Sequence, residues 1–188
     1  MRFVPFEHLE TRRLRLRGIA REDIPGYHRL FGSARVARFM LWQPHSHMAQ
    51  SEAAVEKLLA RYEGGRCYRW GIALKETGEL IGIVELLRFA ETEGSCSFAY
   101  MLREDHWGRG FGTEALRAAL DFGFGEMELS AIQADHFADN PASGAVMRKV
   151  GMTQVGIFPG KYEKEGILHD AVEYRITKEE WKKTHGTI

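Results

Sequence analysis

The stretch Trp107-Gly108-Arg109-Gly110-Phe111-Gly112-Thr113-Glu114-Ala115 decides the predicted fold, because glycines at alternate positions lead directly into a helical pattern. Just before it, residues 97–102 (Ser-Phe-Ala-Tyr-Met-Leu) have the composition of a strand. A strand, a glycine-rich turn and a helix N-terminus together aim unpaired backbone N–H groups and the positive end of the helix at a phosphate. Glycine has no Cβ, so phosphate oxygens can approach the turn closely. The stretch therefore predicts an anion-binding turn, and a tight connection without a ligand is the alternative interpretation.

The segment after the turn is predicted to be an amphipathic helix. Its apolar face consists of residues at helical spacing, namely Leu116, Ala119, Leu120 and Phe124. No Gly-Lys-Ser/Thr follows the turn, so it is not the P-loop of nucleoside triphosphatases. Counted from Gly110, the residues fit the Gly-x-Gly-x-x-Ala variant of the dinucleotide motif, but the antiparallel pattern upstream is not the strand–helix–strand unit that this motif requires.

Length and composition indicate a single domain over residues 1–188, since this length with 44% hydrophobic residues can fill one core. Lys plus Arg and Asp plus Glu number 26 each, so no overall field attracts nucleic acid or an anionic membrane, and we expect neither partner. Cys67 and Cys96 lack a metal-ligand spacing, and His45 and His47 lack a third ligand, so no metal is expected. No apolar run approaches the roughly 18 residues that span a bilayer, and the N-terminal residues 1–7 do not have the h-region of a signal peptide. Both observations predict a cytoplasmic protein.

The order of the predicted elements defines the fold class. Strands are predicted at residues 14–17, 67–75, 80–87, 97–102, 130–136, 153–158 and 169–176, with a charged turn at 161–166. Helices are predicted from residue 21, at 34–39, at 51–62, after the glycine turn, and from Asn140 to Gly151. An antiparallel meander that leads into strand–helix–strand units implies an α/β (α+β) fold with a mixed, mostly antiparallel central sheet of about seven strands and helices on both faces.

Four motifs occur in order along nearly the whole chain. They are Glu-Thr-Arg-Arg-Leu-Arg-Leu-Arg at 10–17, the glycine stretch with His106, Asn-Pro-Ala-Ser at 140–143 continuing to Lys-Val-Gly-Met at 149–152, and His-Asp at 169–170 with Glu-Trp at 180–181. Together they resemble the GNAT acetyltransferase superfamily and, within it, the RimJ/RimL-like branch of ribosomal-protein N-terminal acetyltransferases. The resemblance implies a GNAT-like acyl-CoA N-acyltransferase fold that uses acetyl-CoA.

The resemblance also implies a cofactor site on the glycine turn. The pyrophosphate of acetyl-CoA would lie on the turn, with the cofactor-binding residues Trp107, Gly108, Arg109, Gly110, Phe111, Gly112 and Thr113. The broader superfamily pattern begins with Gln or Arg where this chain has Trp107, a residue that is frequent there in the branch. In the family the strand before the turn diverges from the next strand, and the pantetheine arm lies in the gap. Here the gap would open between residues 100–102 and 134–136.

Acetyl transfer to an amine needs donors for the developing oxyanion and a proton for the departing thiolate. We expect a backbone N–H near Met101 to donate to the oxyanion. The resemblance further implies that Asn140 binds the pantetheine and that Ser143 protonates the thiolate. From the residues alone, Asn140 is a helix cap and Ser143 an ordinary first-turn polar residue.

Glu85 is the candidate general base. In residues 81–87 it alternates with two isoleucines, so it should share their apolar face, where desolvation raises the pKa of a carboxyl group toward neutrality. Exposure to solvent, or pairing with Arg88 or Arg17, is the alternative. A glutamate that some relatives use in the last hairpin is shifted or replaced near residues 162–163.

These features predict an acetyl-CoA-dependent N-acetyltransferase that works by direct attack in a ternary complex. The acceptor is a primary amine, either a protein N-terminal α-amine or a small-molecule amine. A non-catalytic acyl-CoA-binding or sensing module on the same fold is the alternative, and ATP binding is disfavoured by the missing Lys-Ser/Thr. Monomer and homodimer both stay open.

Overall fold

The computed structural model describes residues 1–186. In chain order the elements are β1 (Leu9–Glu10), β2 (Leu14–Arg17), η1 (Arg21–Asp23), α1 (Ile24–Phe31), α2 (Ala34–Ala37), α3 (Met48–Glu63), β3 (Tyr68–Leu74), β4 (Leu80–Ala90), β5 (Ser95–Leu102), η2 (Glu104–His106), α4 (Phe111–Gly125), β6 (Ala131–Phe137), α5 (Pro141–Lys149), β7 (Thr153–Lys164), β8 (Ile167–Thr177) and α6 (Lys178–His185). None of these helices is long and apolar enough to cross a bilayer.

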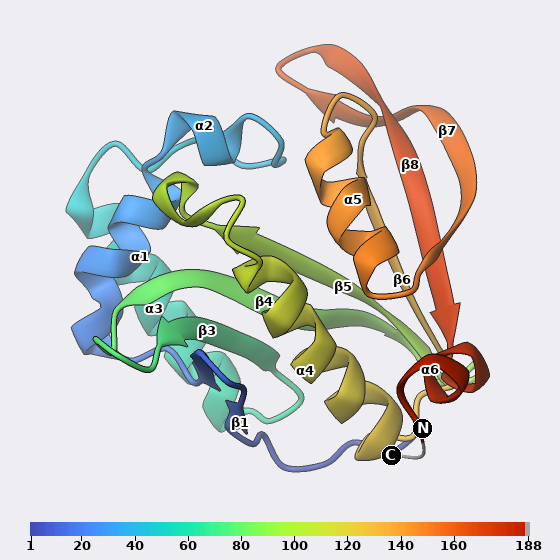
Figure 1. The fold of residues 1–188 in the computed structure, drawn as a ribbon. Coiled ribbons are helices and arrows are strands. Elements are labelled where there is room, and N and C mark those ends of the chain that lie inside the picture. Colours follow the sequence, from blue (N-terminus) through green and yellow to red (C-terminus); the bar gives the residue numbers. More distant parts are fainter. Residues whose placement is uncertain (187–188) are drawn as a thin grey trace.

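One sheet of eight strands organises the fold, in the order β1-β2-β3-β4-β5-β6-β8-β7 (Figure 1). All neighbouring strands are antiparallel except β5 and β6. The predicted mixed, mostly antiparallel sheet is confirmed, and the additional strand is β1, which at 2 residues is too short for alternation to reveal.

The predicted charged turn at residues 161–166 is too long. β7 continues through a register shift between Phe158 and Tyr162 as far as Lys164. The turn itself takes only Glu165 and Gly166, whose φ values of 55° and 76° are those of a tight two-residue hairpin turn. The resulting long hairpin rises above the rest of the sheet (Figure 1).

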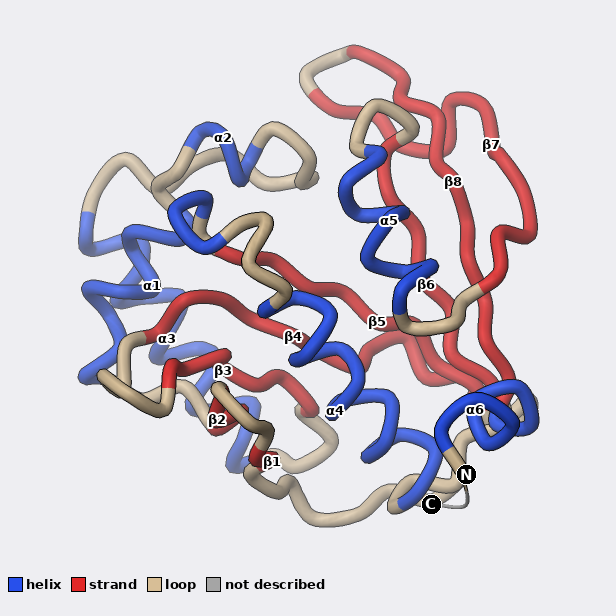
Figure 2. Tube along the Cα trace, viewed as in Figure 1, coloured by secondary structure: helices blue, strands red, loops and turns tan. Residues whose placement is uncertain are grey.

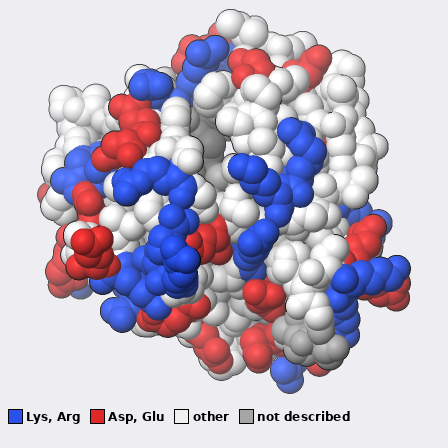
Figure 3. All heavy atoms as spheres, in the orientation of Figure 1, with Lys and Arg blue, Asp and Glu red and all other residues white. Residues whose placement is uncertain are grey.

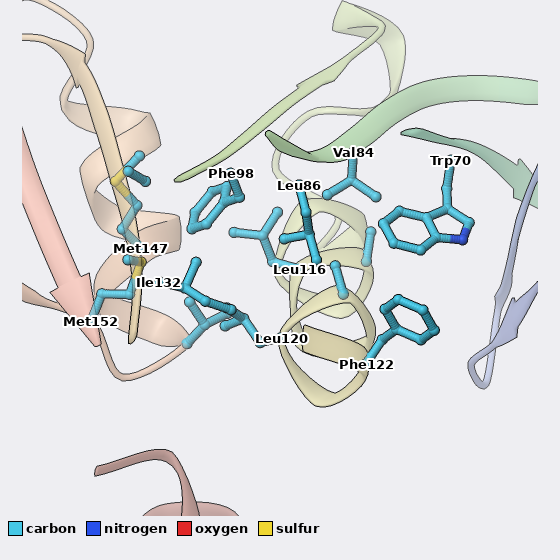
Figure 4. Packing of buried hydrophobic residues seen from close by; sticks show 14 of the residues in the cluster. Trp70, Val84, Leu86, Phe98, Leu116, Leu120, Phe122, Ile132, Met147 and Met152 are labelled. Carbon is cyan, nitrogen blue, oxygen red and sulfur yellow. The ribbon is translucent and has the colours of Figure 1, made fainter. Parts of the chain in front are cut away.

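Helices cover both faces of the sheet, as predicted (Figures 1 and 2). On one face α4, α5 and α6 pack against the larger core cluster, in which Trp70, Leu116 and Phe122 lie close together (Figure 4). On the other face α1 and α3 cover a smaller cluster that contains Tyr27 and Ile83. Each amphipathic helix therefore buries its apolar side against the sheet.

The sheet opens between its two parallel strands. β5 and β6 pair only from Ser95 opposite Ala131 to Ser97 opposite Gln133. Beyond these residues β5 stays paired with β4, and β6 stays paired with β8, so the two strands diverge (Figure 2). This is the gap that the resemblance implies, and it leaves one side of β5 without a strand partner.

Candidate functional site

The turn before α4 has the backbone shape that its glycines predict. Gly108 and Gly110 have φ values of 71° and 80°, in the left-handed region that favours glycine. Gly110 is the N-cap of α4, and no side chain caps the first amide groups of the helix. Within the described residues, the N–H groups of residues 108–113 have no protein acceptor. The turn therefore presents a row of free donors at the positive end of α4.

A cavity of about 330 Å³ lies in front of these donors. This loop cavity is bounded by the turn, the end of β5, the segment after α2 and the first turn of α5. Figure 3 shows this face hollowed between groups of Lys and Arg side chains, and Lys149 is the basic residue that lines the cavity. A narrow space with free amide donors and a cation at its edge suits a phosphate-bearing ligand.

The side chain of Trp107 faces the loop cavity, and that of Arg109 does not. Trp107 lines the loop cavity, and its indole N–H donates to the carbonyl of Leu102 at 2.8 Å. The Arg109 guanidinium lies over the ring of Phe111, 5.1 Å from the centroid, and Arg109 does not line the cavity. Of the two side chains, only that of Trp107 is placed to touch a ligand in the loop cavity.

Asn140 begins α5 on the opposite wall of the loop cavity. Its side-chain oxygen accepts a hydrogen bond from the N–H of Ser143 at 3.4 Å, and Pro141 occupies the first helical turn. The predicted helix cap is therefore formed. The NH₂ group of Asn140 and the hydroxyl of Ser143 are not consumed by this cap and remain available to a ligand.

The register of β5 decides which amide groups near Met101 face the gap, and the N–H of Met101 itself does not. Arg103, directly after β5, donates its N–H to the carbonyl of Ile81 in β4 at 2.8 Å. Successive N–H groups along a strand point to opposite sides, so the N–H of Met101 also faces β4. The N–H groups that face the gap are those of Tyr100 and Leu102. Local sequence carries no signal for this choice, because the register between β4 and β5 determines it.

A second cavity, of about 300 Å³, lies in the gap itself between β5, β6 and the β7–β8 hairpin. The hairpin turn closes this strand cavity from above. Lys164 Nζ donates to the carbonyl of Ala37 at 2.5 Å, and Gln43 Nε2 donates to Glu165 Oε1 at 2.5 Å. The aromatic residues that line the cavity are Phe39, Trp42, Phe98, Tyr100, Phe137 and Tyr162.

Charged groups on one wall of the strand cavity form a network. Lys161 Nζ donates to Asp135 Oδ2 at 2.7 Å and also to Glu173, while the Tyr162 hydroxyl donates to Asp135 at 2.5 Å. Burial alone would lower the pKa of Lys161, but these hydrogen bonds outweigh it and raise the pKa. Lys161 therefore stays an ammonium ion that neutralises the wall. Sequence reasoning missed this network, because its members come from three strands.

Two polar atoms on the strand cavity lack partners. The indole N–H of Trp42 and Nε2 of His136 are buried and make no hydrogen bond within residues 1–186. The ring of His136 donates through Nδ1 to the carbonyl of Phe137 at 2.8 Å, and its Nε2 lies against Gly144 of α5, 2.6 Å from where a Cβ would stand. Leaving buried polar atoms unpaired costs free energy.

Comparison with known proteins identifies the family. A family model, the acetyltransferase (GNAT) domain, matches residues 13–153. The chain belongs to the GNAT acetyltransferase family. Over 173 residues it is 30% identical to the uncharacterized N-acetyltransferase YoaA of Bacillus subtilis (strain 168), covering 92% of this chain and 98% of the relative. The protein is thus an acetyl-CoA-dependent N-acetyltransferase.

Solved structures of other GNAT proteins share the fold. A Vibrio cholerae protein described provisionally as a ribosomal-protein-serine acetyltransferase has a TM-score of 0.80 at 21% identity, over 92% of this chain and 98% of that one. Spermidine N-acetyltransferase from Vibrio cholerae, in complex with CoA and spermine, has a TM-score of 0.77 at 21% identity, over 89% and 97%. At these identities the likeness concerns the fold alone.

Glu85, the predicted general base, lies outside both cavities of this GNAT enzyme. Its carboxylate accepts from Arg69 Nε at 2.5 Å, and the exposed fractions of the two side chains are only 13% and 22%. The pair lies near Tyr27 of α1, and Glu85 lines neither the loop cavity nor the strand cavity. Glu85 lies on the side of Ile83 and Tyr27, as predicted, but Ile81 belongs to the larger cluster on the other face, so the predicted shared face holds for only one of the two isoleucines. The neighbouring strand β3 also supplies a partner, Arg69, that the sequence pattern did not reveal.

Across residues 1–186, no group of three or more His, Cys, Asp or Glu side chains is placed to hold a metal ion. Cys67 and Cys96 are buried free thiols, and burial raises the pKa of Cys96 to about 12. A thiol of this kind is not a ready nucleophile.

Proposed function

We propose that this enzyme holds acetyl-CoA in the loop cavity and receives its amine acceptor through the strand cavity. One observation carries the proposal. Five residues line both cavities, so the two spaces meet at three polar side chains, Tyr100, Asn140 and Ser143, and two apolar ones, Phe39 and Met40. A cofactor on one side and an acceptor on the other can therefore approach each other without crossing the sheet.

The cofactor end of the proposal rests on the free amides of the turn. The pyrophosphate would accept hydrogen bonds from N–H groups of residues 108–113, with Lys149 nearby as a counter-charge. Hydrogen bonds to charged groups contribute about 1.5–3 kcal/mol each. Two or three of them are enough for micromolar affinity when combined with apolar contacts along the pantetheine arm.

The chemistry follows from the groups at the junction. Acetyl-CoA supplies an acetyl group activated as a thioester. We assign the N–H of Tyr100, in place of Met101, as donor to the carbonyl oxygen of this group, because it faces the gap. The N–H of Leu102 and the side chain of Asn140 hold the pantetheine arm, and the Ser143 hydroxyl protonates the departing sulfur. Holding the reactants together supplies most of the acceleration, since effective molarities reach about 10⁵ M or more.

The charged residues that line the strand cavity limit which amine could be the acceptor. Asp135 and Glu173 could bind a second ammonium group of a polyamine, but Lys161 already occupies both carboxylates. The cavity also contains Arg88, so its charges balance. We therefore favour the α-amine of a peptide N-terminus, as in the RimJ/RimL-like branch, over a polyamine such as the substrate of the spermidine acetyltransferase.

The test is a thiol-release assay on a panel of amines, with calorimetric titration of acetyl-CoA alongside. Peptides with a free N-terminus should release CoA, whereas the same peptides with an acetylated N-terminus should not. Faster release with spermidine than with any peptide would contradict the acceptor assignment. Binding of acetyl-CoA without release on any amine would instead identify a non-catalytic acyl-CoA-binding module.

A pair of serine variants tests the junction directly. Ser143→Ala should lower kcat by about 100-fold, the usual contribution of a positioned proton donor, with the Kd for acetyl-CoA unchanged. Ser46→Ala is the matched control, because Ser46 is exposed and bonds only to Gln50. Equal kcat values for the two variants would remove Ser143 from the mechanism.

A further inference from the structure

We infer that Arg88 selects the acceptor by binding a carboxylate of the amine substrate, so that peptides with Asp or Glu among their first two residues are preferred. The inference rests on the proposed function, because it takes the strand cavity as the acceptor site. Arg88 enters this cavity through a bulge in β4, and among the described residues it has no carboxylate partner.

The bulge in β4 turns Arg88 away from the core. Arg88 and Phe89 stand opposite a single residue of β5, Cys96, because the register between the two strands shifts there. Regular alternation would place residue 88 on the side of Leu86, which is buried in the larger core cluster. Phe89 packs against that cluster instead. The extra residue therefore allows Arg88 to leave the core side of the strand.

The backbone of Arg88 has an unusual conformation. Its φ is 52°, in the left-handed region that is unfavourable for any residue except glycine. Within residues 1–186, the other non-glycine residues with a positive φ lie outside the helices and strands, namely Arg66, Glu128 and Glu165. Arg88 lies inside a strand, and strained residues concentrate at functional sites. Here the strained backbone accompanies a side chain that lines the strand cavity.

Arg88 is the charged residue of the strand cavity that lacks an ion-pair partner within residues 1–186. The other charged residues that line the cavity are Lys161, Asp135 and Glu173, and Lys161 pairs with both carboxylates. Burial raises the pKa of Tyr162, and the nearby Arg88 opposes this rise. The phenol is neutral at pH 7, so it does not balance the charge of the guanidinium.

The charges of the cavity favour an acceptor that carries both signs. Arg88 and Lys161 balance Asp135 and Glu173, so an acceptor with only an ammonium group would add one positive charge. An acceptor with an ammonium group and a carboxylate adds no net charge. The planar guanidinium can hold a carboxylate through two parallel N–H groups. Arg88 is therefore suited to bind the acidic side chain of a peptide acceptor.

The position of Arg88 along the sheet sets the distance between this carboxylate and the reacting amine. Leu87, next to Arg88, pairs with Ser97, which lies three residues before Tyr100 in β5. At about 3.3 Å per residue, these two positions in β5 are about 10 Å apart. The long side chain of Arg88 covers part of this distance. The remainder is within reach of an acidic side chain on the first or second residue of a peptide whose α-amine lies at the junction.

The experiment measures kcat/KM for peptides that differ only in their first or second residue, with Glu, Gln or Lys at that place. At one of the two positions, the wild type should prefer Glu to Gln by about tenfold, near the lower limit for hydrogen bonds between charged groups, because Arg88 is exposed. The preference should disappear in Arg88→Gln and Arg88→Gly. Glycine adopts a left-handed φ without strain, so Arg88→Gly removes the guanidinium and keeps the fold. Arg88→Glu should instead prefer Lys to Glu.

Arg66→Gln is the matched control. Arg66 is also an arginine with a left-handed φ, 53°, and it lines neither cavity. This variant should keep the wild-type preference for Glu.

The outcomes separate this inference from the proposed function. If the wild type accepts peptides without preferring Glu at either position, or if the preference survives in Arg88→Gln or Arg88→Gly, the inference is wrong and the proposed function stands. An Arg88→Glu variant that still prefers Glu to Lys would also overturn the inference. Release of CoA with no peptide at all would refute the proposed acceptor, and the inference would fall with it.

Discussion

Replacement of Gly110 by Ala tests the link between the backbone of the turn and cofactor affinity. Gly110 has a φ of 80°, and a Cβ there would meet only Arg13 Nη2, at 3.4 Å. The penalty is therefore conformational, about 1–2 kcal/mol for a left-handed non-glycine residue. For a chain of this size that corresponds to a fall in Tm of about 2–8 °C. If the turn relaxes to avoid the strain, at least one amide donor is lost to the phosphate, which raises the Kd for acetyl-CoA tenfold or more.

Gly78→Ala is a matched control for this variant. Gly78 lies in the turn between β3 and β4, has a φ of 72°, and would place a Cβ in open space. It should lose similar stability and keep the wild-type affinity. Thermal unfolding and calorimetric titration with acetyl-CoA measure the two quantities. If Gly110→Ala loses stability like the control but keeps the wild-type Kd, the donors of the turn do not hold the pyrophosphate, and the reasoning is refuted.

Three further outcomes concern Glu85, Asp121 and the native state as a whole. Glu85→Gln should leave the pH dependence of turnover unchanged. It should lower the free energy of unfolding by about 1–3 kcal/mol, because Arg69 keeps a mostly buried charge without its partner. A shift in the pH dependence of kcat would instead support Glu85 as the base. Burial raises the pKa of Asp121, so the folded state holds its proton more tightly than the unfolded state, and this group makes stability fall as pH rises from about 3.9 through the folded pKa. The amide oxygen of Asp121→Asn can still accept from the indole N–H of Trp181. Between pH 4 and pH 7, urea unfolding of this variant should show a smaller loss of unfolding free energy than that of the wild type. A loss equal to or larger than the wild-type loss would contradict the assignment. Acetyl-CoA at 100 times its Kd should stabilise the fold by about 2.7 kcal/mol, seen as a rise in Tm of about 5–11 °C that ATP at the same concentration does not give.

Most of the elements could be predicted because their signals are local. The glycine turn, the Asn140 cap with Pro141, and the apolar face of α4 each depend on residues within a few positions of one another. The end of β7 was harder to predict from the sequence. The residues Lys161 to Lys164 read as a charged turn, but they continue the strand, because pairing with β8 resumes after the register shift.

The sequence by itself determined that a strand, a left-handed glycine turn and a helix N-terminus follow one another, because backbone sterics and helix capping act over short distances. Only the tertiary structure decided which groups meet around that turn. The register of β4 and β5 turns the amides of Tyr100 and Leu102, and not that of Met101, toward the gap. Pairing between strands places Glu85 beside Arg69. It also brings Asp135, Lys161 and Glu173 together on one wall of the strand cavity. Such contacts join residues far apart in the chain, and only the packing of the whole sheet fixes them.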